Sequence, residues 1–577
     1  MTSIRANHKT SSFFILFVLL LMSSLYFHAN IGGSGMRIPN NILVWLFGSL
    51  IGFYGLYRFS RSEHIILPRF TWLLLAFPVM ALFSGVAAGV VNSTEWFLRL
   101  FYIWGGVLFF FSLFQFNFTP KKIDQILLWI IIASVLHAII GIAQILYVND
   151  LPGWLPVNQQ GEPTGTFQQI NNHASFQVTS LMLVFWLLTR PITKSTHWSM
   201  MTLLFIAIFS STFVVSFSGS RVAILGFLLA FPLFVLSRWK YIQTNKKRWG
   251  SVILVMSLAI IATHQIDTDK GLSSIGEKTA AINAGYSGDA RLGIYTISFD
   301  LVKESPIYGH GIGSFARVWQ SAKPDFYEHH PDATLPSQRV SHPHNEIIYW
   351  LVEGGLLAGI GLILFGVALL KMLWYLPMSR RYAYAALLLP IILHTQVELP
   401  FYISSLHWFI MLVLLFVVFY PSRVKYEKQL SIAANTSLKG LSGIGGVVAV
   451  AFFTHSMLAN LEFRDYLLKR SDPEQVFDMA MDNPYFRDLA TQVTMSLLYE
   501  QSRQIGIRDN IEIFADWVEN ELNRNPHINL FRLAIRSRLD LKDEKKACAL
   551  NERAQAIYPR DKGFNTIKDE CSALEHA

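Results

Sequence analysis

The chain has 577 residues, of which 52% are hydrophobic and 15% are charged, with a mean hydropathy of +0.37. A soluble chain would carry about a quarter charged residues, so this composition excludes an ordinary soluble enzyme. The formal net charge of +9 does not indicate nucleic acid as a partner, because cytoplasmic loops of membrane proteins are rich in Lys and Arg.

Many apolar residues lie in runs of about 17 to 25 residues, the length that crosses roughly 30 Å of hydrocarbon. The first run, Phe13–His28, is apolar behind a basic start, but no small-residue cleavage site follows it, so we expect a retained helix. We predict an all-α polytopic membrane protein with about thirteen transmembrane helices. These lie near residues 13–29, 42–59, 71–91, 95–116, 123–147, 174–189, 198–217, 221–237, 251–264, 346–374, 382–398, 403–420 and 440–460.

Basic residues set the expected orientation of these spans. Lys and Arg gather in alternate connections, among them Arg58, Arg61, Lys121, Lys122, Arg238, Lys240, Arg380, Arg381, Arg423 and Lys425. The connection 151–173 has neither residue type. The positive-inside rule therefore predicts a cytoplasmic N-terminus and, for an odd number of spans, a periplasmic C-terminus in a bacterial inner membrane.

Three segments are then expected on the periplasmic side. They are the Gly/Pro/Gln/Asn-rich stretch 151–173, a large loop at 265–345 and the tail after residue 460. We predict a transmembrane domain over 1–460 and a helical domain over 461–577, which is long enough for a core of its own. Asn-Pro at 483–484 and 525–526 and Tyr-Pro at 558–559 punctuate the tail. This spacing fits either a divergent TPR-like array or a small irregular helical domain.

Cys548 and Cys571 are the two cysteines of the chain. In a periplasmic tail they could form a disulfide, and two unrelated thiols are the equal alternative. Neither has the spacing of a metal ligand.

Ionisable residues cluster toward the outward ends of the predicted spans. Arg99 lies about one turn into the fourth span, Arg221 follows an outward Ser-Gly-Ser turn, and His394 and Glu398 close the eleventh span. One arginine at a helix end is usually a side chain that reaches for the headgroups. Several on one face predict a cationic site for an anionic group at the membrane surface.

The large loop adds a histidine at the mouth of a helix. Ser341-His342-Pro343-His344-Asn345 runs directly into the apolar segment that begins at Glu346. A histidine with a pKa near 6.5 can act as a general base at neutral pH. A zinc site is the weaker alternative, because the loop histidines lack a short ligand spacing with an acidic partner.

The outward stretch 165–175 is dense in amide side chains: Gly-Thr-Phe-Gln-Gln-Ile-Asn-Asn-His-Ala-Ser. Amides do not titrate or attack as nucleophiles, but they bind hydroxyls and pyrophosphate oxygens. We expect either a substrate-binding element or a polar loop that caps the sixth helix.

These features together resemble the O-antigen ligase and polymerase superfamily. The resemblance covers roughly residues 205–420 and includes Arg291, the Pro-x-x-Gly-x-Gly-x-Gly element at 306–313, and His344-Asn345 before Glu-x-Gly-Leu-Leu. Ala358 departs from the family pattern, in which Gly is usual. Within the superfamily, the stretch Gly165–Phe176 is similar to the element of bacterial protein O-oligosaccharyltransferases, the pilin glycosylation ligases.

The resemblance implies a GT-C-like, metal-independent transferase without a cofactor. Its donor would be an undecaprenyl-pyrophosphate-linked oligosaccharide, and its acceptor a Ser or Thr hydroxyl of a periplasmic protein or pilin. It implies His344 as the essential histidine, with Arg221 and Arg291 as the pyrophosphate-binding arginines. Further expected donor or acceptor contacts are Gln169, Asn172, Asn345, Tyr402, Glu398 and Arg99.

Three alternatives stay open. An O-antigen ligase would use the same apparatus with lipid A core as acceptor, and an O-antigen polymerase would extend the glycan. A polysaccharide transporter is the alternative from another class. It should show internal repeats and polar groups near the bilayer midplane, whereas this chain gathers its charges at one face.

Overall fold

The computed structural model describes residues 2–90, 92–148, 150–193, 198–266, 288–336, 339–470 and 477–575. Across these ranges the chain is helical almost throughout, with one pair of short strands. The prediction of an all-α polytopic membrane protein is confirmed.

Each of the predicted spans falls on a helix. Within the ranges given above, nine helices of at least 18 residues are apolar enough to cross a membrane. Ser11–Ser23 and Thr71–Ala87 are shorter apolar helices. The number of thirteen crossings stays a prediction.

The chain forms two compact units. Unit 1 comprises Met1–Ala76, Tyr102–Thr279 and Ile363–Met479, and unit 2 comprises Phe77–Phe101, Ala280–Leu362 and Ala480–Ala577. Four helices have residues in both units: α3 (Thr71–Ala87), α4 (Ser93–Phe114), α14 (Glu346–Tyr375) and α19 (Asp478–Asp482). The predicted division after residue 460 stays a prediction, and residues 267–287 of the predicted large loop lie outside the described ranges.

Unit 1 is a bundle of long apolar helices. Its helices are α1 (Thr2–Ser23), α2 (Pro39–Arg61), α5 (Pro120–Leu146), α6 (Ile170–Leu188), α7 (Trp198–Ser218), α8 (Arg221–Thr244), α9 (Lys246–Ile266), α15 (Met378–His394), α16 (Pro400–Ile403), α17 (Ser405–Phe419) and α18 (Ile432–Leu467). Short 3-10 turns are η1 (Gly35–Arg37), η2 (Gly165–Phe167), η3 (Pro191–Thr193) and η4 (Tyr420–Ser422). Pro120 at the start of α5, next to the Thr119 cap, shows how local sequence sets these boundaries.

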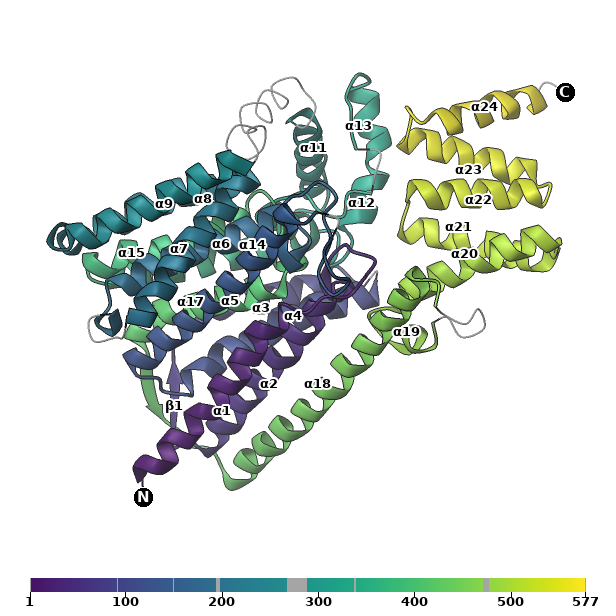
Figure 1. The fold of residues 1–577 in the computed structure, drawn as a ribbon. Coiled ribbons are helices and arrows are strands. Elements are labelled where there is room, and N and C mark those ends of the chain that lie inside the picture. Colours follow the sequence, from purple (N-terminus) through teal and green to yellow (C-terminus); the bar gives the residue numbers. More distant parts are fainter. Residues whose placement is uncertain are drawn as a thin grey trace. The chain divides into compact units, whose positions relative to one another are not determined.

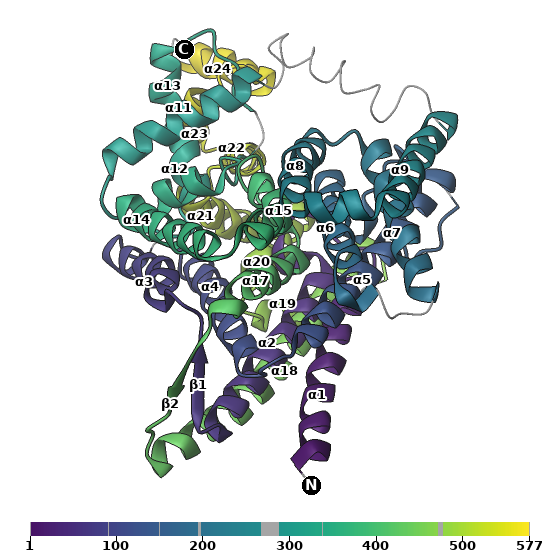
Figure 2. The same ribbon diagram turned by 90° about the vertical axis from the view of Figure 1, so that its left-hand side faces the viewer.

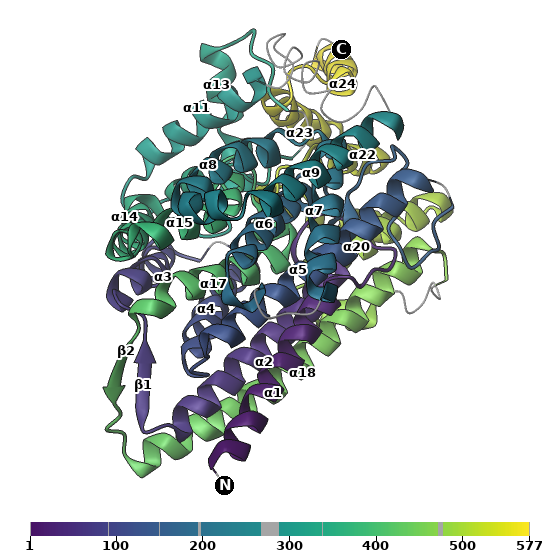
Figure 3. The ribbon, with the colours of Figure 1, turned by 60° about the vertical axis from the view of Figure 1, so that its left-hand side comes forward.

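Burial separates the central helices of unit 1 from the outer ones. In α6, every residue from Asn172 to Leu188 is buried, and α17 is buried almost as completely. These two helices lie in the core of unit 1. The long helix α18 packs along α2 (Figure 1) and exposes most of its apolar residues, as expected of a helix that faces lipid. Helices α8 and α15 pack together elsewhere in the unit (Figure 3).

A two-stranded antiparallel sheet joins the connection after α2 to the one after α17 (Figure 2). Its strands are β1 (His64–Leu67) and β2 (Val424–Glu427), with His64 opposite Glu427. The pair joins the connection that contains Arg69 to the one that contains Arg423, Lys425 and Lys428.

Unit 2 contains the described part of the large loop and the C-terminal helices. The loop forms α11 (Gly288–Glu304), α12 (Phe315–Ser321) and α13 (Lys323–His329). The C-terminal helices are α20 (Arg487–Ile505), α21 (Arg508–Arg524), α22 (Ile528–Asp540), α23 (Glu544–Ile557) and α24 (Lys562–Glu575), and successive ones pack against each other (Figure 1). They share one apolar core, and the Cys548–Cys571 disulfide joins α23 to α24. A TPR-like array stays a prediction.

Candidate functional site

A tight turn and the start of α6 carry the amide-rich stretch Gly165–Phe176. The turn η2 ends at Gln168, whose φ of 56° places a non-glycine residue in the left-handed region. Gln169 then caps α6, because its side-chain oxygen accepts a hydrogen bond from the Asn172 amide over 2.6 Å. A cap of this kind satisfies a helix N–H that otherwise lacks a partner. The stretch is therefore a defined turn with fixed side-chain directions.

Glu398 joins this turn to the segment after α15. Its carboxylate accepts hydrogen bonds from Gln169 Nε2 over 2.8 Å and from Asn171 Nδ2 over 2.9 Å. His394, the last residue of α15, places Nε2 3.1 Å from the same carboxylate. Hydrogen bonds to an ionised acceptor are stronger than those between neutral groups, so Glu398 anchors both amides.

Buried histidines extend this network into the helices. The Ser175 hydroxyl lies 2.8 Å from His394 Nδ1 and 3.2 Å from His407 Nε2. His407 Nδ1 in turn lies 2.8 Å from the Ser404 hydroxyl. All four side chains are buried. Polar groups inside a membrane domain need internal partners, and these contacts fix α6, α15 and α17 around Glu398.

The start of α8 is tied to the same turn. The Ser220 hydroxyl donates to Asn171 Oδ1 over 2.7 Å and caps α8 by accepting from the Ala223 amide. The next residue, Arg221, is exposed. Asn171 thus connects Glu398 with the residue before Arg221. The sequence singled out Gln169 and Asn172 but not Asn171, and only its place beside them could have indicated it.

Asn172 has an unusual environment. Its side chain is fully buried, and neither its amide nitrogen nor its oxygen has a hydrogen-bond partner among the residues that the structure describes. An unsatisfied buried polar group costs about 1–3 kcal/mol, so Asn172 is suited to bind a hydroxyl or a water. Tyr402, half-buried on α16, lies in the same connection as Glu398.

In unit 2, the glycine-rich stretch docks on a break in α14. The break is at Gly355, whose φ of 61° and ψ of −163° are not helical. Four backbone hydrogen bonds join the two segments: His310 N to Val352 O, Gly311 N to Glu353 O, Leu356 N to Pro306 O, and Leu357 N to Ile307 O. The Pro-x-x-Gly-x-Gly-x-Gly element and the Glu-x-Gly-Leu-Leu element are therefore one structural unit.

Glycine is required at this contact. Gly309, Gly311 and Gly313 have φ of 69°, 94° and 83°, which residues with a side chain rarely adopt. A Cβ atom on Gly309 would lie 2.5 Å from the carbonyl carbon of Glu353. These glycines therefore permit both the positive φ and the close backbone approach that the contact needs.

Glu353 lies at the centre of this contact, with 1% of its side chain exposed. One carboxylate oxygen accepts from the Phe315 amide over 3.1 Å, and the other accepts from Arg99 Nη1 over 3.1 Å. The Arg99 guanidinium also stacks over the Tyr349 ring at 4.4 Å. Arg99, predicted as a substrate contact, is thus paired with a buried carboxylate.

His344 precedes α14 in a conformation that side chains seldom adopt, with φ of 56°. Its amide donates to His342 Nδ1 over 3.2 Å, and the two rings lie 4.5 Å apart. The Asn345 side-chain oxygen accepts from the Ile348 amide over 3.0 Å and so caps α14. Residues with strained backbone conformations cluster at functional sites, and His344, the predicted base, has such a conformation.

Arg291 lies on α11 with its side chain exposed. The helix is held by its other face, where Ile294 is buried and its carbonyl accepts from Trp319 Nε1 over 3.3 Å. The three predicted catalytic residues divide between the units, because Arg221 belongs to unit 1 and Arg291 and His344 belong to unit 2. In the part of the chain that the structure describes, no group of three His, Cys, Asp or Glu side chains converges as a metal site.

The fold is that of a polytopic helical membrane protein, and each of its two units contains one of the polar clusters described above. Residues 205–363 match the family described as O-Antigen ligase, and residues 382–569 match the family described as Virulence factor membrane-bound polymerase, C-terminal. The two matches fit the O-antigen ligase superfamily and support a membrane glycan ligase or polymerase activity with a lipid-linked glycan donor. No curated protein matches the sequence.

Proposed function

We propose that this protein transfers an oligosaccharide en bloc from undecaprenyl-pyrophosphate to Ser or Thr hydroxyls of periplasmic proteins or pilin. The observation that carries the proposal is the pair of hydrogen bonds that Glu398 accepts from Gln169 and Asn171. These amides belong to the stretch that resembles the protein O-oligosaccharyltransferases. A carboxylate that fixes two amides gives them the preorganisation that a binding element needs.

In this proposal, His344 is the general base. The acceptor hydroxyl oxygen forms a bond to the anomeric carbon while its proton passes to the His344 imidazole. The bond between that carbon and the pyrophosphate oxygen breaks, and its electron pair leaves with the pyrophosphate. A positioned base of this kind contributes roughly 10²–10⁴ in rate. The product has inverted configuration at the anomeric carbon.

Arg221 and Arg291 stabilise the negative charge that develops on the leaving pyrophosphate. Guanidinium is planar, permanently charged and able to bind phosphate oxygens in pairs. Both side chains are exposed, which leaves them accessible to a donor headgroup. Loss of one preorganised donor typically costs about 10²–10³ in rate.

The proposed localisation is the bacterial inner membrane, with the site and the C-terminal helices in the periplasm. The Cys548–Cys571 disulfide supports it, because disulfides persist in oxidising compartments. The absence of Lys and Arg from 151–173 supports it as well.

The test is glycosylation of a periplasmic acceptor in cells deleted for the protein and complemented at equal membrane levels. Wild type should restore the glycan by intact-mass analysis, whereas His344→Ala and Arg291→Ala should not. His329→Ala and Lys303→Ala, exposed changes on the same loop, are the matched controls. A covalent glycosyl-enzyme intermediate would contradict direct displacement.

A polymerase is the second candidate, supported by the match of residues 382–569 to the polymerase C-terminal family. In the same cells, it predicts that the acceptor stays glycosylated in the deletion while surface polysaccharide is shortened. Loss of polysaccharide from lipid A core, at unchanged chain length, would instead indicate an O-antigen ligase.

A further inference from the structure

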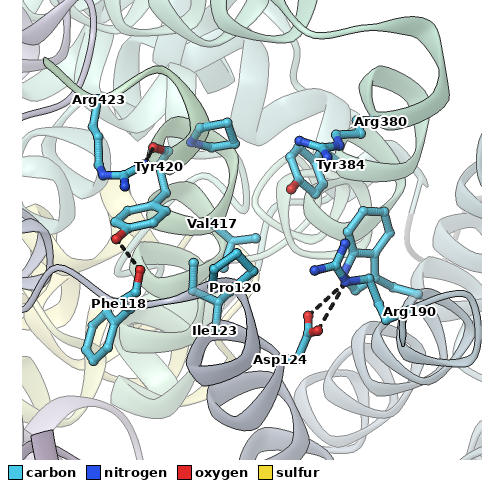
Figure 4. A pocket seen from close by; sticks show the side chains of 12 residues that line it. Phe118, Pro120, Ile123, Asp124, Arg190, Arg380, Tyr384, Val417, Tyr420 and Arg423 are labelled. Atoms are coloured by element: carbon cyan, nitrogen blue, oxygen red, sulfur yellow. Dashed lines mark hydrogen bonds and ion pairs between the residues drawn. The ribbon is translucent and has the colours of Figure 1, made fainter. Parts of the chain in front are cut away.

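A pocket of about 180 Å³ lies at the end of unit 1 where the sequence concentrates Lys and Arg (Figure 4). It is bounded by the first turn of α5, the end of α6, the start of α15 and the turn after α17. Its polar lining consists of Arg190, Arg380, Arg423, Asp124, Tyr384 and Tyr420. A cavity that holds one buried water needs only about 15 Å³, so this pocket can hold a larger polar group.

The pocket lining carries more positive than negative charge. Asp124 is its only carboxylate, and Arg190 Nε occupies both carboxylate oxygens, at 3.0 and 3.2 Å. Arg380 forms no ion pair or side-chain hydrogen bond with any residue that the structure describes. Arg423 donates one Nη1 hydrogen bond to the Tyr420 carbonyl over 2.9 Å. Two guanidinium groups therefore keep unused donors at the pocket.

Aromatic side chains also line the pocket, and one of them stacks with two guanidinium groups. Trp186, Tyr384 and Tyr420 are buried. Arg190 and Arg238 lie over the Trp186 ring at 5.5 and 4.4 Å. Arg238 Nε is buried without a hydrogen-bond partner within the described ranges. Arg190, Arg380 and Arg423 all line this one pocket, and Arg238 stacks on Trp186, which is also a lining residue.

We propose that this pocket binds the phosphate of an anionic lipid headgroup. The non-bridging phosphate oxygens would accept hydrogen bonds from Arg380 and Arg423, whose planar forks match phosphate geometry. The pocket lies at the ends of α5 and α17, which are apolar enough to cross a membrane, and basic pockets between such helices recognise anionic lipid headgroups. The site is separate from the amide-rich turn and does not rest on the proposed transfer reaction.

Lipid retention by the purified full-length protein tests the proposal. Wild type and Arg380→Gln/Arg423→Gln would be placed in nanodiscs of phosphatidylcholine with a minority of phosphatidylglycerol, and bound lipid measured by native mass spectrometry. Arg61→Gln/Lys247→Gln is the matched control, because it removes two exposed charges from the same unit outside the pocket. Melting curves in neutral detergent verify that all three proteins fold.

We expect the pocket variant to retain phosphatidylglycerol at least about tenfold more weakly than wild type and the control, since it loses two charged hydrogen-bond donors. Inorganic phosphate, added to phosphatidylcholine nanodiscs, distinguishes a soluble source. Saturable phosphate binding by wild type without phosphatidylglycerol retention would overturn the lipid assignment. Equal retention by wild type and the pocket variant, with both folded, would overturn the site itself.

Discussion

Gln169 donates a hydrogen bond of 2.8 Å to Glu398 across 229 positions of the chain. The same carboxylate holds Asn171, which bonds to Ser220 immediately before Arg221. One acidic side chain therefore determines where the amide-rich turn lies with respect to the start of α8. This makes Glu398 a positioning residue whose loss should act through the amides.

We predict that Glu398→Ala lowers glycan transfer by roughly 10²-fold, because it removes two hydrogen bonds to a charged group worth about 1.5–3 kcal/mol each. Glu398→Gln should be milder, since its carbonyl oxygen can still accept one of them. Transfer is measured by intact-mass analysis of the acceptor at equal membrane levels. Glu427→Gln on β2 is the control. Equal activity of the Ala variant and wild type would show that the turn keeps its geometry without Glu398.

A second prediction concerns the buried pair of Arg99 and Glu353. Removing one member of a buried pair costs about 3–5 kcal/mol, because the other charge is left uncompensated. Arg99→Met should therefore destabilise the protein strongly. Glu353→Gln should destabilise it less, because this change removes the buried negative charge itself. The double variant should recover part of the loss.

Melting temperatures of the four proteins in detergent form the double-mutant cycle for this pair. If Arg99 is a substrate contact rather than a structural partner, Arg99→Met should melt like wild type while transfer falls. That outcome would restore the role that the sequence predicted for Arg99.

A third prediction follows from the glycine contact. Gly309→Ala should destabilise the protein by about 2–4 kcal/mol. An alanine there would be strained by the positive φ, and its Cβ atom would also overlap the Glu353 backbone. Gly366→Ala is the control, since nothing lies within 4 Å of a Cβ atom there. Thermal melting in detergent measures both. Similar melting of the two variants would mean that the 305–314 segment can move away from α14 at little cost.

Much of the fold was predictable because hydrophobic length is a strong signal in membrane proteins. Each predicted span falls on a helix, and α18 is expected from its sequence although most of it is exposed. The break at Gly355 was not predictable, because the apolar run that predicts a helix gives no sign that one of its residues has non-helical backbone angles. It arises from backbone hydrogen bonds to residues about 50 positions earlier.

The candidate site was predictable in its residue types but not in its pairings. Gln169 and Glu398 were each singled out, yet their hydrogen bond joins segments 229 positions apart, which one sequence cannot show. Arg99 illustrates the reverse case. Its place near a helix end predicted a substrate contact, whereas the structure pairs it with Glu353 of α14.

The last prediction concerns Lys323 on α13, which is 1% exposed in unit 2. Its ammonium donates to the Pro336 carbonyl over 2.8 Å and lies 4.8 Å from the Tyr558 ring of the C-terminal helices. Burial lowers the pKa of Lys323 from 10.5 to about 7. Because the unfolded chain binds more protons between pH 7 and 10.5, the free energy of unfolding should rise with pH in that window.

The rise is at most about 1.4 kcal/mol per pH unit. It should appear between pH 7 and 9 as higher protection factors for amide hydrogen exchange in α12, α13 and α23, after correction for the intrinsic exchange rate. Lys323→Met should abolish this dependence, since methionine does not titrate. Lys303→Met is the control, because Lys303 is exposed and paired with Asp300 over 2.7 Å. If wild type and Lys323→Met show the same slope, folding does not lower the pKa of Lys323 and its deprotonation does not stabilise unit 2.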